Sequence, residues 1–148
     1  SAAWSARDPA LTEVTVGSGF LASGLFDDYR GLLLEPAAGF ALEVVRRPAP
    51  DIYTCLGGGF VASGAPAPDR LPRPWLPAGF TLLGTEGAGE VQTPIRTRRD
   101  LALGDPVLFR HAKAGELAEH VREYLVIRGD RVVSRAATYR GLGHCFLG

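Results

Sequence analysis

The sequence predicts a mainly β fold, a barrel or a sandwich, on three observations. Short segments rich in β-branched and aromatic residues recur along the 148-residue chain, and few stretches have helical periodicity. Glycine supplies 19 residues and proline 11, together 30 of the 148, which is typical of a fold with many turns. Two of the segments flank Gly129-Asp130, the pattern of a tight hairpin. At this length we expect one domain, or one domain with part of another.

The first predicted strand covers residues 11–16, which alternate and are rich in β-branched side chains. It ends at Gly17-Ser18-Gly19, where backbone N–H groups and a serine hydroxyl can converge on an anion such as a phosphate. Most loops of this kind are only turns, so the pattern alone is a weak indication. Residues 21–34 follow as a short helix or an irregular connector.

The next predicted element is a hairpin of residues 40–47 and 52–56 around a proline-stiffened turn at 48–51. After it, five prolines lie between residues 66 and 77. Because proline is excluded from central strands and helix interiors, we expect residues 57–77 to cross the surface as a long loop. Long ordered loops are often functional or lie at interfaces.

Residues 80–84 are predicted to resume the strands. The glycines around Glu90 and Gln92 suit close approach by another chain or a ligand, and they suit a β-bulge equally well. Residues 116–124 contain helix-forming residues over a short length. The hairpin of residues 124–128 and 131–135 is the clearest local pattern in the chain.

Composition excludes several classes of function. Sixteen Lys and Arg balance sixteen Asp and Glu, so no net field favours nucleic acid or an anionic membrane. No stretch approaches the roughly 18 apolar residues that a membrane-spanning helix needs. The first residues lack the basic and apolar regions of a signal peptide. We therefore expect a cytoplasmic protein that binds neither nucleic acid nor membrane.

The two cysteines, Cys55 and Cys145, are far apart and follow no metal-binding or redox spacing, so free buried thiols are favoured. A hydrolase that uses Cys145 as nucleophile with His144 is the least favoured function. Adjacent residues in an extended tail rarely reach each other productively.

The candidate site lies in residues 104–116, GDPVLFRHAKAGE. The apolar residues 107–109 read as a buried strand, and His111, Lys113 and Glu116 follow it. Lys113 is the only lysine in the chain. A single ammonium beside a histidine and a carboxylate is a candidate catalytic group. A solvated turn in an arginine-rich protein is an equally good interpretation of these residues alone.

Two parts of the chain resemble a known family. Residues 13–18 (EVTVGS) and 26–29 (FDDY) resemble the end of the catalytic barrel in the D-threonine aldolase and D-serine dehydratase group of fold-type III pyridoxal-phosphate (PLP) enzymes. Residues 104–116 and the tail 138–141 (TYRG) resemble a bacterial branch described as amino-acid aldolase, deaminase or alanine-racemase-like proteins.

The resemblance implies that residues 1–34 are the last strand of a (β/α) barrel with its connector, and that residues 35–148 are the C-terminal β-barrel-like domain. In that family the barrel that bears the Schiff-base lysine precedes these segments. The implied enzyme is a PLP-dependent lyase or isomerase that acts on a (D-)amino acid by aldol cleavage, deamination or racemisation. It is expected to be a homodimer, and this chain without the barrel is expected to be inactive.

The resemblance also implies site residues: Gly17 and Ser18 hold the cofactor phosphate, and His111 serves as acid/base or metal ligand. Metal-using relatives carry aspartate or cysteine two residues after the histidine, where this chain has Lys113. An ammonium is a poor ligand, so a metal at His111 is doubtful. Lys113 either neutralises a substrate carboxylate or pairs with Glu116, and the pair is slightly favoured. A barrel that only binds a partner or dimerises, through the proline loop, is the alternative function.

Overall fold

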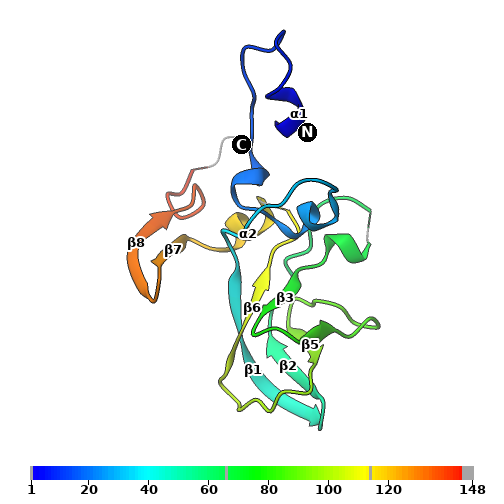
Figure 1. The fold of residues 1–148 in the computed structure, drawn as a ribbon. Coiled ribbons are helices and arrows are strands. Elements are labelled where there is room, and N and C mark those ends of the chain that lie inside the picture. The colour runs from blue at the N-terminus through cyan, green and yellow to red at the C-terminus, as the bar shows by residue number, and fades with distance from the viewer. Residues whose placement is uncertain (1, 66, 114, 145–148) are drawn as a thin grey trace.

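The structure is a computed structural model and describes residues 2–65, 67–113 and 115–144. Its main body is a six-stranded antiparallel sheet (Figure 1) of β1 (Phe40–Ala49), β2 (Ile52–Leu56), β3 (Arg73–Leu76), β4 (Thr81–Leu82), β5 (Gln92–Arg96) and β6 (Pro106–Arg110). The strand order is β3-β6-β1-β2-β5-β4, and the two edge strands lie in contact. The sheet therefore curls into a nearly closed barrel, and the predicted mainly β fold is confirmed.

The remaining elements are short and lie outside the barrel. They are the helices α1 (Ala2–Ser5) and α2 (Gly115–His120), the 3-10 turns η1 (Ser18–Phe20), η2 (Gly24–Asp28) and η3 (Pro68–Arg70), and a separate ribbon of β7 (Glu123–Arg128) and β8 (Arg131–Ala137). Among the described residues, no helix has the length and apolarity needed to cross a membrane.

The predicted hairpin at 40–56 forms as β1 and β2, but its turn is shorter than expected. β1 continues through Pro48 to Ala49, so only Pro50 and Asp51 make the turn. The strand pairing shifts register between Arg46 and Ala49. A proline fits in β1 because Pro48 lies within this irregularity, where the ladder of hydrogen bonds is already broken.

The prediction of a strandless loop over residues 57–77 is wrong, because β3 contains Pro74. β3 is an edge strand, and Pro74 lies opposite Phe109 of β6. At an edge the missing N–H of proline removes no hydrogen bond to a second neighbour. Pro94 lies in the interior strand β5, and its carbonyl accepts from Leu83 N–H at 3.3 Å, just past the end of β4. In an antiparallel strand the N–H and C=O of one residue face the same side, so the missing N–H of Pro94 faces the region past the end of β4 and costs the sheet little.

The glycines at 57–59 lie against the backbone of residues 89–91. Gly57 N–H donates to Val91 C=O at 2.8 Å, and a Cβ added at Gly59 would lie 2.6 Å from the backbone N of Glu90. The close approach expected around Glu90 is thus made by this chain's own backbone.

The strand predicted at residues 11–16 does not form. These residues run as an irregular segment toward η1, and no other strand of the described chain lies beside them (Figure 1). A strand is stable only when its N–H and C=O groups meet those of a neighbour, so the alternating pattern is not sufficient here. Residues 21–34 contain only η2 and irregular backbone, as one of the two alternatives predicted.

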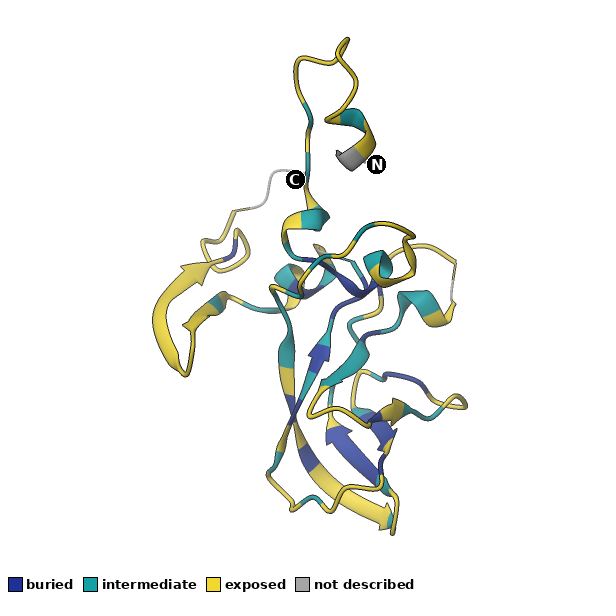
Figure 2. Cartoon of the chain, viewed as in Figure 1, coloured by how far each residue is buried: buried dark blue, intermediate teal, exposed yellow. Residues whose placement is uncertain are grey.

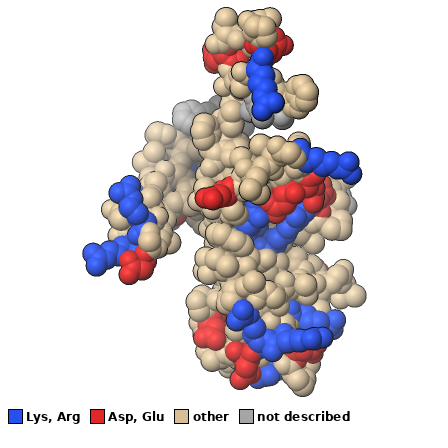
Figure 3. All heavy atoms as spheres, in the orientation of Figure 1, with Lys and Arg blue, Asp and Glu red and all other residues tan. Residues whose placement is uncertain are grey.

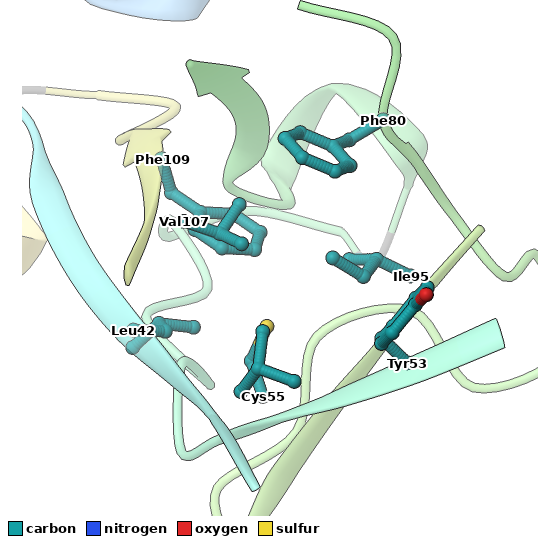
Figure 4. Close-up of a cluster of buried hydrophobic side chains, with 8 residues drawn as sticks. Leu42, Tyr53, Cys55, Phe80, Ile95, Val107 and Phe109 are labelled. Carbon is teal, nitrogen blue, oxygen red and sulfur yellow. The ribbon is translucent and has the colours of Figure 1, made fainter. Parts of the chain in front are cut away.

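The core fills the barrel with buried side chains from β1, β2, β5 and β6 and from Phe80 just before β4, and Leu82 of β4 packs against them (Figure 4). Its buried members are Leu42, Val44, Tyr53, Cys55, Phe80, Ile95, Val107 and Phe109. Cys55 is a free thiol, as predicted, and burial raises its pKa to about 11. Cys145 lies outside the described residues. Because Val107 and Phe109 point inward from β6, the strand delivers the residue that follows it to the rim of the barrel.

The ribbon β7–β8 forms with its turn at Gly129-Asp130, as predicted. It stands away from the barrel, and almost all of it is exposed (Figure 2). Its base is closed by Thr138, whose hydroxyl donates to Val121 C=O at 2.8 Å. A Cβ added at Gly141 would lie 1.9 Å from Arg122 O, so only glycine fits this closure.

Candidate active site at the end of strand β6

His111 follows the last residue of β6 and is 1% exposed. Neither Nδ1 nor Nε2 has a hydrogen-bond partner within the described part of the chain. Burial lowers the pKa of this imidazole, and the positive charge of Arg110 lowers it further. His111 is therefore a neutral base at pH 7, and the described residues give its two buried ring nitrogens no hydrogen-bond partner.

The connector pairs with the chain at His111. Gly24 N–H donates to His111 C=O at 3.0 Å, and Leu25 N–H donates to Ala112 C=O at 3.1 Å. Ser23, the preceding residue, is buried, and its hydroxyl has no partner among the described residues. The site thus lies where residues 22–28 cross the end of β6, on the side of the barrel toward which the N-terminal segment runs (Figure 1).

Arg110 fixes the connector through its side chain. Its Nη1 donates to Asp27 Oδ2 at 2.8 Å, and its Nη2 donates to Asp27 Oδ1 at 2.8 Å and to Ala22 C=O at 2.7 Å. Arg73 of β3 adds a contact to Asp28 at 3.3 Å. The sequence alone did not predict these partners of Arg110 and Arg73. The only available signal was the adjacent pair of acids in the FDDY segment, within reach of an arginine next to His111.

Lys113 and Glu116 make contacts that differ from the favoured ion pair. The Lys113 ammonium donates to Ser63 C=O at 2.8 Å and lies 3.3 Å from the Ser63 hydroxyl. The Glu116 carboxylate accepts the backbone N–H of Lys113 at 2.7 Å, at the start of α2. The Glu116 carboxylate therefore caps the start of α2. The Lys113 side chain connects the segment after β6 to the loop of residues 62–64.

Tyr124 lies near Glu116, and no pattern in the sequence pointed to it. Its hydroxyl is buried and has no partner among the described residues. Burial raises its pKa, and the charges of Glu116 and Tyr139 raise it further. The phenol therefore remains protonated and can donate a hydrogen bond at this end of the molecule.

Gly17 and Ser18 stand at the start of η1. The carbonyls of Gly17 and Ser18 accept from Phe20 and Leu21 at 3.1 Å each, whereas the N–H groups of residues 17–19 make no backbone hydrogen bond within the described chain. A Cβ added at Gly17 would meet nothing within 4 Å. The loop leads into residues 22–24 beside His111, but no hydrogen bond joins Gly17 or Ser18 to His111 in the described residues.

Within residues 2–65, 67–113 and 115–144, no group of three or more His, Cys, Asp or Glu side chains is arranged to hold a metal ion. His111 as a metal ligand stays a prediction.

The fold is similar to that of a D-threonine aldolase from Filomicrobium marinum, with a TM-score of 0.57 and 19% sequence identity. The similarity covers 74% of this chain and 30% of that chain, so this chain spans about a third of the length of the solved structure. Neither a protein-family profile nor a curated protein sequence matches the chain. The predicted mainly β, C-terminal barrel-like domain of this fold is confirmed.

Proposed function

We propose that this chain is the C-terminal part of a PLP-dependent enzyme that acts on a (D-)amino acid by aldol cleavage, deamination or racemisation. Residues 35–148 are its β-domain, and residues 1–34 are the end and connector of its catalytic barrel. The similarity in fold to a D-threonine aldolase supports the proposal. The observation that carries it is His111, buried at the end of β6 with both ring nitrogens unpartnered in the described chain.

His111 is the proposed acid/base. A neutral imidazole at the rim of the β-domain can take a proton from a bound amino acid and return it. Its lowered pKa keeps it in the accepting form at neutral pH. The connector fixes its backbone, and the Arg110–Asp27 pair fixes the connector. The β-domain thus contributes one positioned group to a site that the barrel completes.

Gly17 and Ser18 are proposed to hold the cofactor phosphate. Residues 17–19 offer N–H groups that make no backbone hydrogen bond in the described chain, and Gly17 leaves open space, so a phosphate oxygen fits there. PLP, when bound, acts as the electron sink for bonds at the substrate Cα. The lysine that would hold PLP belongs to the proposed barrel. Lys113 is the only lysine of this chain, and its ammonium is hydrogen-bonded to Ser63.

Lys113 and Glu116 are proposed to order the segment between β6 and α2. This order keeps the Lys113 ammonium near the part of the site where the amino-acid substrate is proposed to bind. With Lys113 two residues after His111, we propose that no divalent ion is held tightly.

The test uses the complete enzyme. His111→Ala should lower kcat by roughly two to four orders of magnitude, the usual range for a positioned acid or base, while His120→Ala at the end of α2 should not. Chelators should have little effect. Inactivation by a chelator with recovery on zinc or manganese would overturn the metal-free proposal. Borohydride trapping of PLP on Lys113 in this chain alone would overturn the proposal that the chain is inactive by itself.

A second candidate is a dimerisation module, and the ribbon β7–β8 favours it. Its exposed apolar side chains belong to both strands and are Leu125, Val126, Ile127, Val132 and Val133. A two-stranded ribbon is marginally stable alone, so a partner that covers these side chains would stabilise it. We propose that the partner is a second copy in a homodimer. A monomeric mass in light scattering across a wide concentration range would contradict this.

A further inference from the structure

A hollow lies at the end of the barrel opposite His111. β5 and β6 run in opposite directions around the sheet, so the end of β5 that carries Arg96 is far from the end of β6 that carries His111. The hollow has a volume of about 600 Å³ and is open to solvent. The residues that matter for its chemistry are Asp51, Thr81, Arg96, Thr97, Arg98 and Arg99.

Two of the arginines are held by their Nε atoms. Arg96 Nε lies 3.1 Å from Asp51 Oδ2, and Arg99 Nε donates to Ala78 C=O at 2.8 Å. The backbone N–H of Arg99 also donates to the buried Thr97 hydroxyl at 3.1 Å. Within the described residues, neither guanidinium makes a side-chain hydrogen bond through its Nη groups. Both therefore keep paired donors for a ligand while their positions are fixed.

Arg98 lies between them and is exposed, and it has no ion pair or side-chain hydrogen bond within the described chain. Thr81 of β4 stands opposite Arg96 of β5 in the sheet, so its hydroxyl lies on the same wall. The hollow thus combines two fixed guanidinium groups, one unpartnered guanidinium and a hydroxyl.

The charge of the hollow differs from that of the whole protein. The chain has no net charge, yet three arginines and one aspartate line this hollow. On the face shown in Figure 3, Lys and Arg atoms of the lower part of the molecule lie among Asp and Glu atoms, so the excess of positive charge is local to the lining of the hollow. Because Asp51 is compensated by Arg96, a net positive charge remains for an anion.

We propose that this hollow binds a small molecule that carries a phosphate or diphosphate group. The Nη groups of Arg96, Arg98 and Arg99 donate to the phosphate oxygens, and the Thr81 hydroxyl adds a neutral donor. Guanidinium forks match the geometry of phosphate oxygens, and the volume is in the range of small-molecule sites. The hollow is separate from the His111 site and does not depend on the function proposed for it.

The proposal is tested by calorimetric titration of the full chain at low ionic strength, with pyrophosphate, inorganic phosphate and citrate as probes. We expect saturable binding of one pyrophosphate per chain, weaker binding of phosphate and citrate, and loss of affinity with added salt. Arg98→Gln and Arg96→Gln should each weaken pyrophosphate binding about tenfold, because each removes charged hydrogen bonds. Arg131→Gln, which removes an exposed arginine at the tip of the ribbon, should leave it unchanged.

Circular dichroism of each variant establishes that it is folded, and Arg98→Gln changes only an exposed side chain. The absence of saturable pyrophosphate binding overturns the proposal. An affinity reduced equally by Arg98→Gln and Arg131→Gln overturns it as well, because the binding would then follow overall charge. Citrate binding as tight as pyrophosphate binding overturns the assignment of a phosphate ligand.

Discussion

Arg110 and Asp27 form a two-pronged ion pair, Nη1 to Oδ2 and Nη2 to Oδ1, with both distances at 2.8 Å. The arginine side chain is only 12% exposed, so this pair is better shielded from solvent than the other ion pairs of the described chain. It joins residues that are 83 positions apart and lies directly beside His111. The geometry of the candidate active site therefore depends on a contact outside it.

Asp27→Asn should destabilise the protein by about 2 kcal/mol, because it leaves a shielded guanidinium without its counter-charge. Asp28→Asn is the matched control. Asp28 contacts Arg73 at 3.3 Å with its side chain 73% exposed, so its loss should cost less than about 1 kcal/mol. Urea unfolding of both variants measures the difference. Equal losses of unfolding free energy would show that the two-pronged pair stabilises the protein no more than the exposed pair does.

His111 should make stability depend on pH. Its pKa is lowered from 6.5 in the folded state by burial and by Arg110, so the unfolded chain binds a proton first as the pH falls. The free energy of unfolding should therefore decrease below about pH 6.5 and level off once the folded state is also protonated. His111→Gln should remove this part of the decrease, and His120→Gln should not. The measurement is chemical denaturation at a series of pH values.

Gly141→Ala should destabilise the closure of the ribbon, because the added Cβ would lie 1.9 Å from Arg122 O. Overpacking of this kind usually costs about 1–3 kcal/mol. Gly115→Ala is the control, since a Cβ there meets nothing and alanine favours a helix. Amide hydrogen exchange should show faster opening of β7 and β8 in Gly141→Ala alone. Unchanged amide exchange in Gly141→Ala would mean that the backbone near Gly141 shifts to accommodate the Cβ without a loss of stability.

Ile127→Lys should weaken self-association, because Ile127 is 65% exposed in the apolar surface of the ribbon. Leu33→Lys is a suitable control, with a leucine that is 95% exposed on the connector. Sedimentation at several concentrations compares the two variants with the parent chain. If both variants shift the equilibrium equally, the ribbon is not the interface.

Cys55 should be inert toward thiol reagents while the protein is folded. Burial raises its pKa to about 11, so almost no thiolate is present at pH 8. In a Cys145→Ser background, a chromogenic disulfide reagent should react only after denaturant is added. Rapid reaction under native conditions would indicate that the barrel core opens locally.

The sequence predicted those parts of the fold in which neighbouring residues decide the structure. The Gly129-Asp130 turn and the strand over residues 107–109 are such cases, because turn chemistry and a short apolar run act within a few residues. The strand at residues 11–16 failed because a strand also needs neighbours, which a local pattern does not specify. Pro74 was misassigned for a related reason, since its edge position is a property of the whole sheet.

The candidate site was predictable in part. His111 stood out because a titratable residue ended an apolar run. The hydrogen bond of His111 to Gly24 and that of the neighbouring Arg110 to Asp27 were not predictable, because they join segments more than 80 positions apart. The contact of the Lys113 ammonium with Ser63, 50 positions away, is likewise not specified by local sequence. The proximity of Glu116 in sequence favoured an ion pair with that ammonium, whereas the carboxylate accepts the backbone N–H of Lys113.

The arginines of the ribbon bear on fibril formation. Within the described residues, β7 and β8 pair only with each other, so each presents an outer edge with open backbone donors and acceptors. Such edges add further strands without limit unless charges discourage the approach. Arg128 and Arg131 stand opposite each other near the tip, whereas Arg135, farther along β8, is paired with Glu123. A second ribbon that approached edge to edge would bring like charges together, so growth into open-ended polymers is opposed while the apolar faces remain free to pair.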